Sequence, residues 1–202
     1  RTIQAVRHCA AMYFKNKNYS KAEEYYKRIL EKYNDPAETK IALEALRDVL
    51  KEQGRLDEWA ALVEKYDKTG ASKDEVEFAM FENAEELYDK NEYEKAINEL
   101  NKYISKYPKG KYIDKARFYR AESYVALNKY DLAIEDYEYV LSGKASAQTE
   151  TANMRLAGIF YTKKDYALAL KYYQNLEKLA SQPANMSVAV TGLMRCYFRT
   201  ND

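Results

Sequence analysis

The chain has 202 residues, and its 33 Lys and Arg against 32 Asp and Glu leave a formal net charge of +1 at pH 7. This balance argues against a general electrostatic attraction to nucleic acid or to an anionic membrane surface. Hydrophobic residues make up 47% and charged residues 32%, which is typical of a folded protein rather than a disordered one. No apolar run approaches the roughly 18 residues that cross a bilayer, so we expect no transmembrane segment here.

The two ends of the sequence each fall inside an amphipathic pattern, and the first residue is Arg1. We therefore interpret the chain as a fragment of a longer protein, so it gives no information about an upstream signal peptide or lipid anchor. The two cysteines, Cys9 and Cys196, do not form a disulfide framework. We expect each of them to pack as a small apolar residue in a helix.

A tyrosine followed three residues later by an alanine recurs along the chain at steps of 36 or 37 residues. The aligned first residues of this motif are Tyr19, Leu56, Tyr93, Tyr130 and Tyr166. In four of the five copies, a second alanine precedes the first by twelve residues. The pairs are Ala10 with Ala22, Ala84 with Ala96, Ala121 with Ala133, and Ala157 with Ala169. Large apolar residues at offsets of three and four from these alanines predict one apolar stripe on each of two helices per copy.

Short polar stretches separate the two stripes of every copy. They are residues 15–18, 51–55, 89–92, 127–129 and 162–165. Since each is long enough only for a tight turn, every copy is predicted to be two antiparallel helices. The paired alanines mark the crossing, because two helices approach closely only where side chains are short. The copy at 37–73 carries Arg47 and Trp59 at these positions, so its helices should cross at a wider distance.

A repeat of this length predicts an all-α solenoid. The expected units are 1–36, 37–73, 74–110, 111–147, 148–183 and a partial unit at 184–202. The longer break at 67–75 stays in phase with the repeat, so we expect a single domain over residues 1–202.

The arrangement resembles the tetratricopeptide repeat family. The resemblance rests on the small–x–x–aromatic turn, on the Tyr–x–x–Ala start of the second helix, and on Pro108 where the family often ends its unit. It implies a right-handed α-solenoid of five repeats plus one extra first helix, in which Met194 and Tyr197 occupy the two diagnostic positions. Residues 103–141 are similar to bacterial cell-envelope members, namely the Tol–Pal-associated cell-division coordinator and the lipoprotein of outer-membrane protein assembly. This favours the periplasm or cell envelope, with the cytoplasm as the alternative.

The inventory of reactive side chains argues against an enzyme. The chain has one histidine, His8, which cannot form a ligand cluster by itself and which we expect to be a solvated surface residue. No phosphate-binding glycine loop is present. We therefore predict no catalytic residue, no metal site and no cofactor.

The resemblance implies that fixed positions of each first helix face an inner groove. The predicted partner-binding residues are Phe14, Phe78, Phe81, Glu82, Glu85, Tyr88, Asp89, Phe118, Tyr119, Glu122, Arg155, Tyr161, Arg195 and Phe198. The middle of this groove should be aromatic and acidic, and its C-terminal end aromatic and basic. For a single ring such as Phe81, Phe118 or Tyr161, packing between adjacent first helices is the alternative.

Three functions remain open at this stage. The first is a scaffold that binds a protein or peptide in the groove, where exposed aromatic side chains are typical of interfaces. The second is a carbohydrate-binding surface, since tyrosine rings stack on sugars. The third is a spacer or regulatory module. The Lys and Asn pair with which some family members hold a partner's C-terminal carboxylate is missing. The last helix lacks a partner for Val188, Leu193, Tyr197 and Phe198, so we expect self-association or fraying at this edge.

Overall fold

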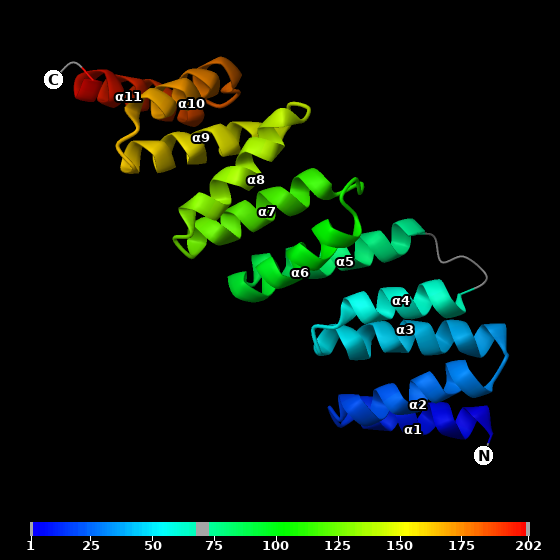
Figure 1. The fold of residues 1–202 in the computed structure, drawn as a ribbon. Coiled ribbons are helices and arrows are strands. Elements are labelled where there is room, and N and C mark those ends of the chain that lie inside the picture. The colour runs from blue at the N-terminus through cyan, green and yellow to red at the C-terminus, as the bar shows by residue number, and fades with distance from the viewer. Residues whose placement is uncertain (1, 68–72, 201–202) are drawn as a thin grey trace. The chain divides into compact units, whose positions relative to one another are not determined.

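A computed structural model describes residues 2–67 and 73–200. Over these residues the chain forms eleven α-helices and no strand, which confirms the all-α fold class (Figure 1). The helices are α1 (Ile3–Lys15), α2 (Tyr19–Lys32), α3 (Pro36–Glu52), α4 (Leu56–Tyr66), α5 (Lys73–Asp89), α6 (Tyr93–Lys106), α7 (Ile113–Ala126), α8 (Tyr130–Ser142), α9 (Ala147–Thr162), α10 (Tyr166–Leu179) and α11 (Pro183–Thr200). No helix of the described ranges is long and apolar enough to span a bilayer.

The second helix of every predicted repeat begins at the residue that starts the sequence motif. Helices α2, α4, α6, α8 and α10 begin at Tyr19, Leu56, Tyr93, Tyr130 and Tyr166. Odd-numbered helices precede them, and α11 is the extra first helix. The paired-helix organisation predicted from the motif is therefore confirmed.

The turns between paired helices share one backbone geometry. The second residue before each second helix has a positive φ, between 57° and 65°, and these residues are Lys17, Gly54, Asn91, Asn128 and Lys164. The next residue donates its backbone N–H to a carbonyl five positions earlier, as in the 2.8 Å bond from Lys129 to Tyr124. This bond satisfies a carbonyl that the end of the first helix leaves without a partner. The left-handed residue therefore terminates each first helix.

The turn geometry predicts a stabilising substitution at Lys17. A non-glycine residue in the left-handed region pays a steric cost of about 1–2 kcal/mol that glycine avoids. After the greater flexibility of glycine in the unfolded chain is subtracted, Lys17→Gly should stabilise the fold by about 1 kcal/mol. The matched control Lys15→Gly, at the last residue of α1, should instead destabilise it by up to about 1 kcal/mol. Thermal unfolding of both variants tests this, and a shift of the same sign in both would contradict it.

The paired alanines lie where the helices of each repeat cross. All eight have 0% of their surface exposed. In the second repeat, Arg47 is exposed and Trp59 is 7% exposed, with its indole Nε1 donating a 2.9 Å hydrogen bond to the carbonyl of Leu43. The wider helix crossing expected in this repeat stays a prediction.

The chain divides into two compact units, one ending at Asn83 and one beginning at Ala84. The first contains α1 to α4 and most of α5, and the second contains the end of α5 and α6 to α11. The division falls inside α5, so the single domain expected from the sequence stays a prediction. The break at 67–75 lies largely outside the described residues.

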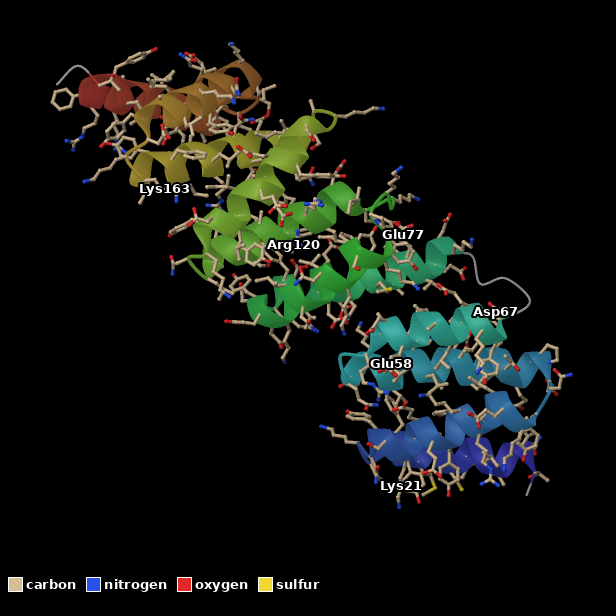
Figure 2. All side chains as sticks on the ribbon, in the orientation of Figure 1. Lys21, Glu58, Asp67, Glu77, Arg120 and Lys163 are labelled. Carbon is tan, nitrogen blue, oxygen red and sulfur yellow. The ribbon has the colours of Figure 1, made fainter. Side chains whose placement is uncertain are left out.

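A buried ion cluster joins α7 to α8 in the second unit. The carboxylate of Asp136, with 1% of its side chain exposed, accepts hydrogen bonds from Arg117 at 2.9 Å and from Arg120 at 2.7 Å to each oxygen. Figure 2 labels Arg120 on α7. Burial alone would lower the pKa of Arg120, but the hydrogen bonds and charge of Asp136 outweigh it and raise the pKa. The guanidinium of Arg117 also lies 4.0 Å from the ring centre of Tyr139.

Candidate partner-binding groove

The predicted groove residues of the second unit lie mainly on its first helices. Helix α9 packs against both α7 and α11, so these three helices form one surface, which we call the inner surface. Of the groove residues predicted from the sequence, this surface includes Arg155 and Tyr161 on α9, and Arg195 and Phe198 on α11.

Two tyrosines form an aromatic pair between α5 and α7. The rings of Tyr88 and Tyr119 lie 4.9 Å apart, and that of Tyr88 meets Tyr93 edge-on at 5.9 Å. Burial, and then a hydrogen bond to Glu85 and its charge, raise the pKa of Tyr119. Three predicted residues, Glu85, Tyr88 and Tyr119, therefore form one half-buried cluster. Asp89, at the end of α5, is exposed.

Glu122 and Arg155 are joined in an ion pair between adjacent repeats. Glu122 is 8% exposed and accepts hydrogen bonds from Nε of Arg155 at 2.9 Å and from Nη2 at 2.8 Å. It also accepts one from the hydroxyl of buried Tyr137. Burial, followed by the charge of Glu122, raises the pKa of Tyr137. Glu122 thus fixes the direction of Arg155, whose side chain remains 43% exposed.

A pocket of about 310 Å³ lies beside Arg155, between the fourth and fifth repeats. Its lining residues come from α7, α8, α9 and the turn after α9: Val125, Tyr130, Met154, Arg155, Gly158, Ile159, Thr162 and Lys163. A Cβ atom added at Gly158 would meet nothing within 4 Å. We call this space the Gly158 pocket.

A second, more open hollow of about 370 Å³ lies between α9 and α11. It is lined by Tyr161, Met194, Arg195, Phe198 and Arg199. Phe198 is 69% exposed and Met194 is 68% exposed, whereas Tyr161 is half-buried, with its ring edge-on to Tyr166 at 5.4 Å. The predicted residues Tyr161, Arg195 and Phe198 are therefore brought together in one place.

Other predicted residues are less accessible. Phe81 is 2% exposed, so its ring is buried inside the protein. This agrees with the alternative that the ring packs in the interior instead of binding a partner. Phe118 is half-buried and packs on the core of the second unit, with its ring 6.2 Å from that of Tyr137. Phe14 is half-buried, and its ring lies 5.8 Å from that of Tyr19.

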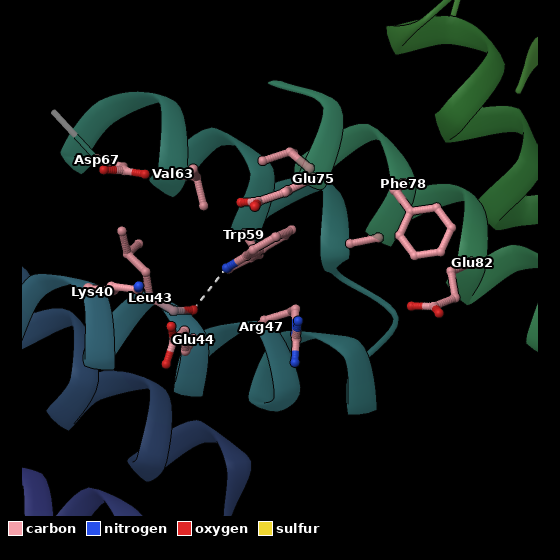
Figure 3. Close-up of a pocket in the computed structure, with 12 residues that line it drawn as sticks. Lys40, Leu43, Glu44, Arg47, Trp59, Val63, Asp67, Glu75, Phe78 and Glu82 are labelled. Carbon is pink, nitrogen blue, oxygen red and sulfur yellow. Dashed lines mark hydrogen bonds between the residues drawn. The ribbon is translucent and has the colours of Figure 1, made fainter. Parts of the chain in front are cut away.

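The first unit has its own pocket, of about 510 Å³, next to Trp59 (Figure 3). The predicted residues Phe78 and Glu82 line it, and Phe78 is 42% exposed. Glu44, Glu75 and Asp67 also line it, with Lys40 and Arg47 among them. Acidic and basic side chains therefore both line this pocket.

The structure places His8 on the surface of α1. Within residues 2–67 and 73–200, no group of three or more His, Cys, Asp or Glu is placed to hold a metal ion. Cys9 is half-buried and Cys196 is buried, and neither forms a disulfide.

One face of α11 is apolar and exposed. Its exposed fractions are 38% at Met186, 40% at Val190, 68% at Met194 and 49% at Tyr197. The opposite face, with Ala189, Gly192 and Cys196, is buried. The two residues predicted at the diagnostic positions of the sixth repeat, Met194 and Tyr197, thus lie on the exposed face. Self-association through this edge stays a prediction.

The two glycines inside α9 and α11 have opposite surroundings, which gives a matched pair of predictions. A Cβ at Gly192 would lie 2.4 Å from the ring of Tyr173, so Gly192→Ala should destabilise the fold by about 1–3 kcal/mol. Gly158→Ala meets open space and should stabilise α9 by about 1 kcal/mol. Urea unfolding measures both. Destabilisation by Gly158→Ala would show that the space beside Gly158 is filled.

Comparison with known proteins identifies the family of the chain. Residues 60–185 match the family model described as a tetratricopeptide repeat-like domain, and the chain belongs to this family. Proteins of this family are generally non-catalytic scaffolds for protein–protein interaction. No curated protein matches the chain.

Solved structures show the same helical-repeat fold at low sequence identity. BtubC from P. vanneervenii has a TM-score of 0.55 and 17% identity over 92% of this chain and 83% of its own. The quorum sensor NprR from B. thuringiensis, in its apo form, has a TM-score of 0.52 and 16% identity over 98% of this chain and 60% of its own. The Pseudomonas aeruginosa protein pilF has a TM-score of 0.51 and 18% identity over 98% and 86%.

Proposed function

We propose that this protein is a non-enzymatic scaffold that binds a protein or peptide partner along the inner surface of its second unit. The observation that carries the proposal is the pair of neighbouring hollows on α9, one around Gly158 and one beside Phe198. Exposed aromatic and arginine side chains of the kind found here, Phe198 and Arg195, are enriched at the energetic centres of protein interfaces.

The arrangement suits an extended ligand better than a small molecule. Both hollows open widely to solvent and follow one another on consecutive first helices, so a peptide lying across the first helices would meet each in turn. The half-buried Tyr88 on α5 and Tyr119 on α7 lie one repeat further. The predicted change from an acidic middle to a basic end gives such a ligand a direction.

The setting that we propose is the bacterial cell envelope. Its support is the similarity of residues 103–141 to envelope members of the family. The carbohydrate-binding and spacer functions remain as alternatives, and no feature of the hollows favours either over a peptide.

Partner capture tests the proposed function. The full chain would be used as bait beside a variant carrying Tyr161→Ala, Arg195→Ala and Phe198→Ala. A control variant would carry Leu132→Ala, Glu135→Ala and Lys171→Ala, three exposed residues on second helices. We expect a protein retained by the wild type and the control and lost from the inner-surface variant. A partner retained equally by all three would contradict the proposal. Saturable binding of peptidoglycan fragments, lost in the same variant, would favour the carbohydrate alternative.

A further inference from the structure

The Gly158 pocket has a glycine that the fold itself does not require. Gly158 lies inside α9, where glycine costs about 1 kcal/mol relative to alanine. It does not adopt a positive φ, and a side chain there would touch nothing within 4 Å. Gly192 is the contrast, because Tyr173 occupies the space that its side chain would take. The absent side chain at 158 leaves room beside the helix for a group from outside.

The walls of this pocket are mainly apolar. Val125, Met154 and Ile159 contribute alkyl groups, and Tyr130 contributes a ring that is 37% exposed. The volume of about 310 Å³ accommodates one large side chain with part of its backbone. The hydroxyl of Thr162 donates a 2.9 Å hydrogen bond to the carbonyl of Gly158, so its proton is already used within the helix.

The two cations at the rim are neutralised within the protein. Arg155 is paired with Glu122, and Lys163 donates a 2.6 Å hydrogen bond to Asp131. Figure 2 labels Lys163 at the end of α9. With both charges already paired, the pocket favours a neutral side chain over a charged one.

The charge of the next hollow is different. Helix α11 contains Arg195 and Arg199 and has no Asp or Glu. Both arginines line the hollow that also contains Tyr161 and Phe198. A carboxylate lying there would be attracted by the guanidinium group of Arg195, since guanidinium groups prefer carboxylates as partners.

We propose that the inner surface recognises a peptide with a large apolar side chain, which enters the Gly158 pocket, and an acidic residue further along, which lies against Arg195. This inference rests on the proposed function and specifies the partner's chemistry. The apolar residue supplies the affinity, because its burial at the Gly158 pocket removes the most apolar surface from water. The acidic residue sets the direction in which the peptide lies.

A peptide library and two substitutions test the inference. A displayed library of random twelve-residue peptides would be selected on the full chain. The enriched peptides should share a Leu, Ile, Met or Phe at one position and an Asp or Glu at a fixed distance from it. Gly158→Leu places a side chain in the pocket, where its Cβ meets nothing within 4 Å, and should weaken their binding by about 10- to 100-fold. The control Gly158→Ala should change it by less than about threefold, and Arg195→Gln should weaken it in a salt-dependent way.

The outcomes separate the two proposals. Peptides that bind Gly158→Leu as tightly as the wild type, yet lose binding in the Tyr161, Arg195 and Phe198 variant, would overturn the pocket inference and leave the proposed function standing. Enriched peptides that lack a shared apolar or acidic position would overturn it as well. A library that gives no binder would count against the proposed function and this inference together. Circular dichroism of Gly158→Leu establishes that the variant is folded.

Discussion

Asp136→Ala should destabilise the protein by about 3–5 kcal/mol, because it leaves Arg117 and Arg120 without their shared carboxylate. The side chains of the two arginines are 20% and 16% exposed, so water replaces Asp136 poorly. Removal of one partner from a buried ion cluster costs more than the cluster contributes when intact, since an uncompensated charge remains. For a domain with a typical stability of 5–15 kcal/mol, the loss is a large share of the total.

Chemical denaturation of the variant measures this loss. The control is Asp131→Ala, which breaks the ion pair with Lys163 at a position where Asp131 is 82% exposed. Exposed pairs contribute little, so the control should unfold at nearly the wild-type denaturant concentration. Equal effects of the two substitutions would mean that the Asp136 cluster is solvated and contradict its description as buried.

Stability should also fall steeply above pH 10, because several tyrosines resist ionisation in the folded state. Burial, and then the hydrogen bond to Glu138, raise the pKa of Tyr172 to about 12 from its usual 10. Burial and Glu122 also raise the pKa of Tyr137. A group with a raised folded pKa contributes stability that is complete below its unfolded pKa and is lost as the pH rises through the folded value. Each such tyrosine should therefore lower the free energy of unfolding by at most about 1.4 kcal/mol per pH unit between pH 10 and 12, and by less where water reaches the hydroxyl group.

Urea unfolding at a series of pH values from 9 to 12 tests this effect. The double variant Tyr137→Phe and Tyr172→Phe removes two of the ionising hydroxyls, so its stability should decline less over the same pH range. Absorbance near 295 nm reports tyrosine ionisation directly and should show it delayed in the folded protein. A double variant with an unchanged pH dependence would contradict the assignment to these two residues.

The repeat pattern predicted the fold closely because it reflects local constraints. Tyr19, Tyr93, Tyr130 and Tyr166 follow a tight turn, and in each of these repeats two alanines lie at the crossing. The spacing of both features follows from the periodicity of a helix and from the need for short side chains where two helices cross. The left-handed geometry of the turn residues was not predicted. No single residue type marks this position, because Lys17 and Lys164 occupy it where other repeats have Gly54, Asn91 and Asn128.

The candidate site was predicted less completely, because burial depends on neighbours from other repeats. The position of Phe81 in its helix predicts a groove residue, but the structure buries it. The sequence predicts Glu122 as a residue of an acidic groove, whereas Arg155, 33 residues later, pairs with it. A search for opposite charges 31 to 33 residues apart would have found this pair, and also Arg7 with Glu38 and Glu23 with Arg55. Gly158 carried no signal, since an open space beside a glycine is visible only in three dimensions.

Photo-crosslinking tests most directly whether partners bind at the inner surface. A photoreactive residue at position 162, which lines the Gly158 pocket, would be compared with one at exposed position 135 on α8, in the full protein in its native cells. We predict a defined protein or peptide adduct at 162 that is absent at 135 and is lost on adding Gly158→Leu. An adduct at 135 with none at 162 would contradict the account and place the function on another surface.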